Sequence, residues 1–392
     1  MHNTSNVGQT SFGLGQVALN LAREQAELGC DARVWCMSSA DDVRWAYASS
    51  NLSEGRIVRF STVGPRWLAY SPSMMRAAKS EGGEIDIVHQ HGIWTYGSYV
   101  THLFHQRHCT PYVIAPHGSL ESWALRRARW KKFLALVAYE RANLFGAACF
   151  HATSESEIED FRNFGLIAPV ALIPNGVSSR WLNSRGDAKN FRESFGIPAD
   201  RRILFFLSRI TPKKGLLMLI QAINAIRKEF ADWILVIAGK DEFDHKAEVE
   251  RLVKQLGMED LVRLIGPLFD QPKRDAFAAS DLFVLPSFSE GSPVAILDSL
   301  AVGVPVITTK AAPWKNLDDY FCGWWVDVSV SGLIEALRNA INLSSEELVA
   351  MGQRGHDLVT SKYTWAASAQ KTLDLYEWLL GRRDKPGFVV VD

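Results

Sequence analysis

Short apolar runs that alternate with helix-spaced stretches constrain the fold of this chain more than any other feature. There are six such runs in each half of the chain, and each ends in or near Gly, Pro, Ser or Thr. They cover residues 32–37, 56–62, 85–91, 111–118, 148–154, 170–176, 203–208, 233–239, 262–267, 281–287, 305–309 and 323–327. Strands that are apolar along their whole length and separated by helices belong in parallel sheets covered on both faces. The sequence therefore predicts an α/β protein with two doubly wound, Rossmann-like domains.

A polar stretch at 177–195 separates the two sets of runs and marks the expected domain boundary. It is rich in Asn, Ser, Arg, Gly and Asp, and a new predicted strand begins soon after it. We therefore expect an N-terminal domain at 1–182 and a C-terminal domain at 183–364. Residues 365–392 are expected to form a final helix to about residue 380, followed by a loose tail.

Composition and charge exclude several classes of function. Lys+Arg and Asp+Glu both total 43, so the formal net charge is zero and no overall field attracts nucleic acid. The five cysteines are scattered and never spaced as a metal pair, which speaks against a disulfide framework or a zinc site and fits a reducing cytosol. No apolar run approaches the ~18 residues of a membrane-spanning helix, and no signal-peptide pattern is present. We expect a cytoplasmic protein.

Polar and glycine-containing motifs stand at the ends of several predicted strands. They are Gln90–Gly92, Pro116–Gly118, Pro174–Gly176, Ser208–Arg209 and Ser287–Gly291. Open parallel sheets bind ligands beyond the carboxyl ends of their strands. Two sheets with such motifs predict one ligand-binding cleft between the two domains.

Arg209 and Lys214 lie between a predicted strand and a helix that begins near Gly215. Two cations beside the unpaired N–H groups of a helix N-terminus form an anion site. A diphosphate leaving group needs such stabilisation as negative charge develops on it. On this pair alone, a solvated basic turn is an equally good interpretation.

Glu290 lies at a predicted strand-to-helix turn, where Gly291 permits close approach of a ligand and Pro293 suits the first helical turn. Asp298 follows eight residues later, about two helical turns, which would place both carboxylates on one helix face. Paired acceptors there would hold sugar and ribose hydroxyls. In the alternative interpretation Glu290 only favours the helix N-terminus and Asp298 is a surface charge, which is the simpler reading of Asp298 by itself.

Three histidines lie on or just after predicted strands of the first half. His117, between Pro and Gly, can donate to a sugar hydroxyl or face a developing cation, although a lone histidine is more often structural. His89 and His91 are two residues apart and would share one face of a strand. A metal would need further ligands, and no Cys or acidic cluster lies nearby. We therefore expect no metal, with one of this pair packed and the other near the cleft.

Gly13 and Gly15 precede a predicted helix in the weak Gly-x-Gly-x-x-Ala pattern of dinucleotide-binding proteins. That pattern is meaningful only after a strand, and none is predicted before it. A nicotinamide oxidoreductase is therefore the disfavoured rival hypothesis. The glycine loop otherwise places a helix N-terminus against a donor phosphate or an acceptor, or is an ordinary turn.

A basic and aromatic stretch follows the fourth predicted strand of the first half. It contains Arg126, Arg127, Arg129, Trp130, Lys131 and Lys132. Such a stretch can lie on an anionic bilayer. The commoner alternative is a solvated helix face with a snorkelling Trp. Peripheral contact with the inner face of a membrane is therefore a hypothesis.

Taken in order, these motifs resemble the family-four retaining glycosyltransferases of the GT-B fold, also called group 1 glycosyltransferases. The similarity extends from about Ser11 to Leu380. It is carried by segments 86–94, 111–120, 151–155, 173–177, 209–215, 285–291 and 303–306. It is strongest to bacterial enzymes that build exopolysaccharide or lipopolysaccharide. The resemblance implies transfer from a UDP- or GDP-sugar to a saccharide or lipid-linked saccharide, with no metal or other cofactor.

The resemblance also implies roles in the second domain. Arg209 and Lys214 would hold the donor diphosphate, and Asp298 would take the ribose position. Glu290 would contact the donor sugar. The backbone beside it, at Gly291, Ser292 and Pro293, would line the same donor site.

In the first domain the resemblance places His117 near the transferred sugar and lets the Gly13–Gly15 loop close over donor or acceptor. The expected chemistry is front-face displacement, in which the leaving phosphate helps to deprotonate the acceptor.

Two departures from the family pattern qualify these roles. Asp298 stands where the family has Glu, and one methylene less implies weaker donor binding or an intervening water. Residues 1–8 read as loop, so the family's first, central strand is expected to be missing. Its loss would expose two strand edges, and an upstream-extended chain is expected to melt higher. Both departures keep open a degenerate protein that binds nucleotide sugars without transferring them.

Overall fold

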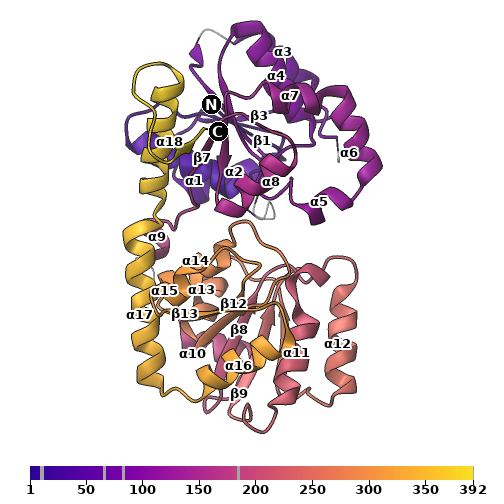
Figure 1. The fold of residues 1–392 in the computed structure, drawn as a ribbon, viewed down its shortest axis with the longest axis vertical. Helices are drawn as coiled ribbons and strands as arrows, with labels where there is room; N and C mark the ends of the chain where they lie inside the picture. Colours follow the sequence, from indigo (N-terminus) through magenta and orange to yellow (C-terminus); the bar gives the residue numbers. More distant parts are fainter. Residues whose placement is uncertain (9–12, 65–67, 82–83, 183–185, 392) are drawn as a thin grey trace. The chain divides into compact units, whose positions relative to one another are not determined.

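The contacts of the computed structural model divide the chain into two compact units. Unit 1 comprises Met1–Gly176 and Trp365–Asp392, and unit 2 comprises Val177–Thr364. In Figure 1 each unit contains a sheet with helices around it. The structure describes residues 1–8, 13–64, 68–81, 84–182 and 186–391.

The change between the units falls before the expected boundary. It lies between Gly176 and Val177, and the chain returns to unit 1 at Trp365. Residue 183, where the second domain was expected to begin, lies outside the described residues, as does Ser11, where the family resemblance begins. The terminal helix is therefore part of unit 1.

Unit 1 contains an eight-stranded sheet in the order β14-β7-β6-β5-β4-β1-β2-β3. All its pairings are parallel except that of β14 with β7. Each predicted apolar run of the first half overlaps one strand. The strands are β1 (His2–Thr4), β2 (Val34–Cys36), β3 (Ile57–Arg59), β4 (Val88–His91), β5 (Tyr112–Ala115), β6 (Cys149–Ala152), β7 (Val170–Leu172) and β14 (Val389–Val390).

Helices connect these strands. Serine side chains at Ser39, Ser71 and Ser154 accept from N–H groups of the first turns of α2, α3 and α8, which satisfies donors that a helix leaves unpaired. The helices of unit 1 are α1 (Leu14–Glu27), α2 (Ala40–Ser50), α3 (Pro72–Ser80), α4 (Tyr96–His108), α5 (Ser122–Arg126), α6 (Arg129–Ala135), the π-helix η2 (Leu136–Glu140), α7 (Arg141–Phe145), α8 (Glu155–Asn163) and α18 (Trp365–Leu379).

The expectation that the first strand is missing is wrong. β1 lies between β4 and β2, and His2 is in register with His89 on one side and Val34 on the other. The three residues of β1 are 1–2% exposed, although all are polar. A strand that is buried on both faces is usually apolar. The polar residues of β1 do not match this pattern, so the sequence did not reveal a central strand here. β1 occupies the central position of the sheet. We no longer expect an upstream-extended chain to melt at a higher temperature.

Several polar groups of this central strand are hydrogen-bonded, as burial favours, whereas Asn3 Oδ1 and Thr4 Oγ1 have no partner among the described residues. The Met1 ammonium donates to Ile87 O at 2.8 Å. Asn3 Nδ2 donates to Gly97 O at 3.1 Å and to Thr101 Oγ1 at 2.8 Å. These bonds offset the desolvation of a strand that has no apolar side chain.

The C-terminal tail is not loose, contrary to expectation. α18 packs against α1 through Val17, Leu21, Trp365 and Ala369, and Figure 1 shows the two helices side by side. β14 then adds an antiparallel edge strand to β7. The tail therefore covers one edge of the first sheet.

Unit 2 contains a six-stranded, all-parallel sheet in the order β10-β9-β8-β11-β12-β13. Each predicted apolar run of the second half overlaps one strand. The strands are β8 (Arg202–Leu207), β9 (Trp233–Ala238), β10 (Val262–Gly266), β11 (Leu282–Leu285), β12 (Val306–Thr309) and β13 (Gly323–Val326).

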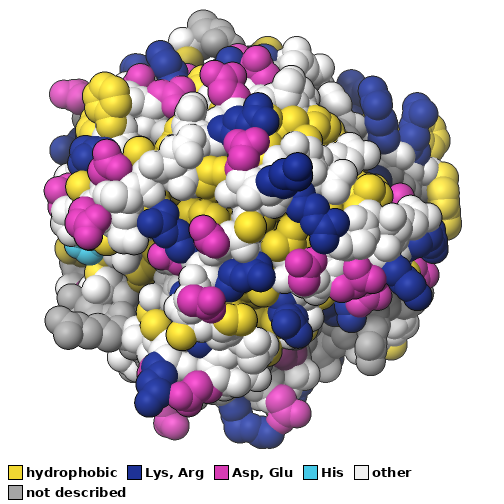
Figure 2. Space-filling model, turned by 90° about the horizontal axis from the view of Figure 1, so that it is seen from below, with side chains coloured by type: hydrophobic (Ala, Val, Ile, Leu, Met, Phe, Trp, Pro, Cys, Tyr) yellow, Lys and Arg dark blue, Asp and Glu magenta, His cyan; other side chains and the backbone are white. Residues whose placement is uncertain are grey.

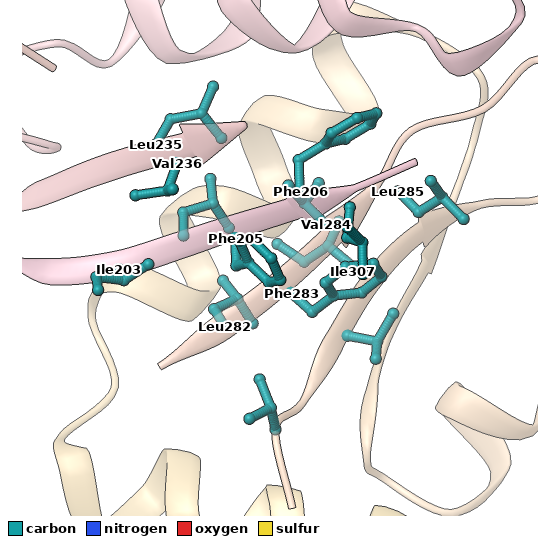
Figure 3. Packing of buried hydrophobic residues seen from close by; sticks show 14 of the residues in the cluster. Ile203, Phe205, Phe206, Leu235, Val236, Leu282, Phe283, Val284, Leu285 and Ile307 are labelled. Carbon is teal, nitrogen blue, oxygen red and sulfur yellow. The ribbon is translucent and has the colours of Figure 1, made fainter. Parts of the chain in front are cut away.

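Figure 3 shows the packing of these central strands, with Phe205, Phe206 and Phe283 among the buried side chains. Phe205 meets Phe277 of α13 edge to face, with ring centroids 5.2 Å apart. The helices of unit 2 are α9 (Ser179–Leu182), α10 (Ala188–Phe195), the 3₁₀ helix η3 (Pro212–Lys214), α11 (Leu216–Ala225), α12 (His245–Gln255), α13 (Asp270–Ala278), α14 (Val294–Ala301), α15 (Asn316–Asp319), α16 (Val330–Ile341) and α17 (Ser345–Lys362).

The surface reflects the balanced charge of the sequence. On the face seen in Figure 2, basic and acidic side chains are interspersed, with hydrophobic side chains between them. Within the described ranges, no helix combines the length and apolar character needed to cross a bilayer.

Candidate functional site

In unit 2 the basic turn after β8 leads into a helix, as the sequence predicts. β8 ends at Leu207, and α11 begins at Leu216 with Gly215 as its N-cap, at φ 70°. A Cβ on Gly215 would lie 2.0 Å from the Pro286 carbonyl oxygen. Glycine is therefore required for the cationic turn to pack against the segment that follows β11.

Lys214 and Glu290 form a buried ion pair across this close approach. Both side chains are 8% exposed. Ser287 Oγ also donates to Glu290 Oε1, at 2.5 Å. Burial lowers the pKa of Lys214, and the adjacent Glu290 raises it in opposition. A solvated basic turn is thus the wrong description of Lys214. The sequence suggested both residues but not their contact.

Arg209 is more accessible than Lys214. Its side chain is 38% exposed, and Nη1 lies 2.9 Å from Glu242 Oε2. Its positive charge lowers the pKa of Lys214 slightly, as a like charge nearby does. Glu242 follows β9 and belongs to no motif, so sequence reasoning missed it.

The prediction that Glu290 and Asp298 share one helix face is wrong. α14 begins at Val294 with Pro293 as its N-cap, so Glu290 precedes the helix. Gly291 and Ser292 also lie in this non-helical segment. The turn therefore presents the backbone of these residues beside Glu290.

Asp298 is not a surface charge. Its residue is 7% exposed, and its carboxylate pairs with Lys273 Nζ at 2.5 Å. Its carbonyl oxygen accepts from Trp181 Nε1 at 3.1 Å, and Lys273 Nζ lies 4.8 Å from the Trp181 ring centroid. Neither partner could be predicted from a sequence pattern, because α9 and α13 meet α14 only in the fold.

In unit 1 the glycine loop follows a strand after all. Gly13 is the N-cap of α1 at φ 107°, and Gly15 is buried in its first turn. The residues that join β1 to Gly13 lie outside the described part of the chain. The absence of a strand therefore no longer argues against a nicotinamide site, whereas the position of Arg209 and Lys214 in unit 2 still does.

His89 and His91 share one strand face, as predicted, with stacked rings whose centroids are 4.5 Å apart. Both are buried, which agrees with the expected packing of one of them, and the position of the other near a cleft stays a prediction. His117 is the half-buried member of the group. Its φ of 52° lies in the left-handed region, which is uncommon for a residue with a Cβ and recurs at functional sites.

His2 brings a third histidine to this pair. One ring nitrogen from each of His2, His89 and His91 lies within 4.8 Å of the others. Among the described residues, these three histidines form the group that could hold a metal ion. His2 was not expected beside His89 and His91, because residues 1–8 have the composition of a loop. In the structure these rings are instead joined to one another and to His117 and His151 by hydrogen bonds.

Burial makes all five rings weak bases. It lowers the pKa of His2 and His117 to about 3 and that of His151 to about 4. The pKa values of His89 and His91 are likewise well below the usual value, first through burial and then through their histidine neighbours. The cluster is therefore neutral near pH 7.

A buried carboxylate fixes the turn that carries His117. Glu157 Oε1 accepts from Gly118 N at 2.5 Å, and Oε2 accepts from the Thr153 amide and hydroxyl at 2.7 Å each. The Ser-x-x-Glu pattern at Ser154–Glu157 could have drawn attention to Glu157 as a helix-capping residue. Its contact with Gly118 depends on the pairing of β5 with β6.

Known proteins share both the sequence features and the fold. Residues 187–357 match the family described as glycosyl transferases group 1, and residues 12–176 match the glycosyl transferase 4-like domain. A D-inositol 3-phosphate glycosyltransferase of Catenulispora acidiphila is 24% identical, over 93% of this chain and 89% of its own. A GDP-mannose:cellobiosyl-diphosphopolyprenol alpha-mannosyltransferase of Komagataeibacter xylinus is 24% identical, over 94% and 90%.

Solved structures agree in fold. Sucrose-phosphate synthase of Thermosynechococcus elongatus superposes with a TM-score of 0.77 at 19% identity, covering 97% of this chain and 99% of that one. Anabaena HepE in complex with UDP and glucose has a TM-score of 0.76 at 16% identity, over 95% and 98%. These relatives define the class, a glycosyltransferase of the GT-B fold. The chain belongs to the group 1 glycosyltransferase family and is an enzyme of that kind.

Proposed function

We propose that this enzyme transfers a sugar from a UDP- or GDP-sugar to a saccharide or lipid-linked saccharide, with retention of anomeric configuration. The observation that carries the proposal is the buried Lys214–Glu290 pair beside the N-terminus of α11. The Komagataeibacter relative is named for GDP-mannose and a diphosphopolyprenol acceptor, and the Anabaena neighbour holds UDP and glucose. The diphosphopolyprenol acceptor of the first relative supports our further proposal of a role in bacterial polysaccharide or lipopolysaccharide synthesis on the cytoplasmic side of the membrane.

The two cations bind one part of the donor, the diphosphate, and the turn after β11 binds the other part, the sugar. Arg209 and Lys214 bind the diphosphate, and Lys214 neutralises charge that develops when the bond from the anomeric carbon to phosphate breaks. Glu290 and the backbone of Gly291, Ser292 and Pro293 hold the donor sugar. The acceptor oxygen attacks the same face of the anomeric carbon, and its proton passes to the departing phosphate oxygen. No metal or cofactor enters this scheme.

Unit 1 contributes the remaining contacts. His117 lies near the transferred sugar, and the Gly13–Gly15 loop places the N-terminus of α1 against donor or acceptor. Backbone N–H groups at a helix N-terminus favour a phosphate or a hydroxyl oxygen.

Calorimetric titration with UDP, GDP and NAD tests the proposal, together with hydrolysis of UDP- and GDP-sugars in the presence of EDTA. We expect one nucleoside diphosphate to bind and Arg209→Ala to lose it, while NAD does not bind. Hydrolysis and transfer should persist in EDTA. Nucleotide binding without hydrolysis or transfer would favour a degenerate binding protein, and binding of NAD alone would favour an oxidoreductase.

Asp298→Glu should strengthen binding of the nucleoside diphosphate about fivefold, because the longer side chain replaces a water-mediated ribose contact by a direct one of about 1 kcal/mol. Titration calorimetry measures the change, with the exposed Asp319→Glu as the matched control. Unchanged affinity would show that Asp298 serves only its pair with Lys273.

The basic stretch is proposed as a membrane-contact surface. α6 presents Trp130 and Phe133 with exposed fractions of 63% and 65%, and Leu134 and Val137 are exposed beside them. Arg129, Trp130, Phe133 and Leu134 also line a shallow surface hollow. Exposed apolar side chains next to cations fit the headgroup region of an anionic bilayer.

Reversing the charges of Arg126, Arg127 and Arg129 should lower partitioning onto anionic vesicles at least about 100-fold, because each cation near such a surface contributes about 1 kcal/mol. Co-sedimentation with vesicles containing phosphatidylglycerol measures it. The matched control reverses the exposed cations Lys246, Arg251 and Lys254 of α12. Equal loss in both variants, or none in the first, would refute this surface.

A further inference from the structure

The buried histidines of unit 1 form two directed segments of hydrogen bonds, one anchored on a backbone carbonyl and the other on a side-chain amide oxygen. His151 Nε2 lies 2.8 Å from Ile173 O. A carbonyl only accepts, so Nε2 carries the proton of this neutral ring and Nδ1 is an acceptor. His89 Nε2, 3.2 Å away, must then donate to His151 Nδ1. His89 Nδ1 in turn accepts from the Tyr376 hydroxyl at 2.7 Å.

Gln25 of α1 anchors the second segment, because its Oε1 lies 2.8 Å from His2 Nε2. Gln25 Nε2 is buried and makes no hydrogen bond of ordinary geometry. Because the Tyr376 proton is engaged by His89, the Tyr376 oxygen is open to a donor, and Gln25 lowers the pKa of Tyr376 that burial raises. Both contacts favour the orientation in which the Gln25 amide oxygen faces His2.

The same logic extends from Gln25 to the strand end. Gln25 Oε1 accepts, so His2 Nε2 is protonated and His2 Nδ1 accepts from His91 Nε2 at 2.9 Å. His91 Nδ1 then accepts from His117 Nε2 at 3.2 Å. His117 is left with its proton on Nε2 and an unprotonated Nδ1, which has no hydrogen bond to any described residue.

We propose that the segment from Gln25 through His2 and His91 fixes the tautomer of His117, so that His117 Nδ1 accepts a hydrogen bond from a sugar hydroxyl. Sequence reasoning gave His117 the role of a donor or of a group facing a cation; the direction of this segment assigns it the role of an acceptor instead. Gln25, His2 and His91 are then positioning residues that act through His117. The identity of the hydroxyl rests on the proposed transferase function, whereas the tautomer does not.

Two constraints meet at His117. The hydrogen bonds from Gln25 to His91 determine which nitrogen of His117 is unprotonated. The hydrogen bond from Gly118 N to Glu157 fixes the left-handed turn that orients the His117 ring. A hydroxyl that donates to Nδ1 has its oxygen lone pairs free for a second partner. A substrate that lacks that hydroxyl would leave Nδ1 unpaired, so the device selects for a hydroxyl at one position of the sugar.

Two-bond ¹H–¹⁵N correlation on protein labelled only at its ten histidines reads the tautomers directly, without donor or acceptor. In the wild type we expect all five cluster histidines to be protonated at Nε2. In Gln25→Met the anchor of the second half is lost, so His2, His91 and His117 should populate both tautomers. His89 and His151 should keep Nε2–H, because Ile173 O still anchors them. The exposed Gln106→Met is the control and should leave all five unchanged.

Several results would overturn the inference. They are an Nδ1-protonated His117 in the wild type, an unchanged His117 in folded Gln25→Met, and a pattern abolished by EDTA, which would place a metal among His2, His89 and His91. If Gln25→Met does not fold, Tyr376→Phe removes the oxygen that favours this orientation of the Gln25 amide and should give the same mixture. With half of His117 in the wrong tautomer, kcat/KM should fall about twofold at unchanged nucleotide affinity. Correct tautomers without any transfer would refute the proposed function alone.

Discussion

Lys214→Met should lower kcat/KM for sugar transfer at least about 100-fold, the usual cost of removing one donor from a site that stabilises developing negative charge. The Lys214 ammonium is buried next to Glu290 and stands at the turn into α11. No other described cation is positioned in this turn in the same buried way, since Arg209 is more exposed and pairs with Glu242. Steady-state kinetics and titration with the nucleoside diphosphate measure the loss.

The same substitution leaves the Glu290 carboxylate buried without its partner, which costs about 3–5 kcal/mol of folding free energy. A variant that removes both charges, Lys214→Met with Glu290→Gln, should regain melting temperature but not turnover. The exposed Lys228→Met should change neither. Turnover of the single variant within tenfold of wild type would show that Lys214 does not bind the leaving group.

The second large expected effect is acid instability of unit 1. The pKa values of His2, His117 and His151 are lowered to about 3, 3 and 4, against 6.5 for the unfolded chain. Between pH 6.5 and about 4 the unfolded state therefore binds more protons than the folded state. The free energy of unfolding should fall with pH in this window, by up to about 1.4 kcal/mol per pH unit for each buried histidine.

Two buried carboxyl groups of unit 1 act with the opposite sign. Burial raises the pKa values of Glu140 and Glu157 above 4.5, so their folded forms take up protons first and gain stability as pH falls. The five histidines outnumber them, and hydrogen bonds to Gly118 and Thr153 limit the shift at Glu157. The net effect should remain destabilising.

Hydrogen exchange followed by mass spectrometry at pH 7, 6 and 5, corrected for the intrinsic exchange rate, separates the two units. The opening free energy of β1, β4 and β6 should fall with pH, whereas that of β8 and β9 should change little. Unit 2 serves as the internal control, because its described histidines are only His245 and His356. Equal opening free energies of β4 at pH 7 and pH 5 would contradict the burial of a neutral cluster.

Local pattern was sufficient to predict most of the fold. Strands such as β8, β9 and β11 are continuous apolar runs because helices cover both faces of their sheet, and that composition is visible in any stretch of the sequence. β1 was missed because it has no apolar side chain, and its His2 and Asn3 find partners on α1, α4 and β4 only in the fold. β14 was missed for a related reason, since two residues beyond the last helix become a strand only by pairing with β7.

The two parallel-sheet domains, the family, and the residue types available for phosphate and sugar binding could all be predicted from the sequence, because they depend on local periodicity and on motifs at strand ends. Which of those residues touch depends on the packing of the folded chain. It joined Lys214 to Glu290 across 76 positions, paired Asp298 with Lys273, and brought His2 beside His91 across 89 positions. The physical reason is that a buried charge or imidazole needs a partner, and that partner is supplied by whichever strand or helix the sheet topology places next to it.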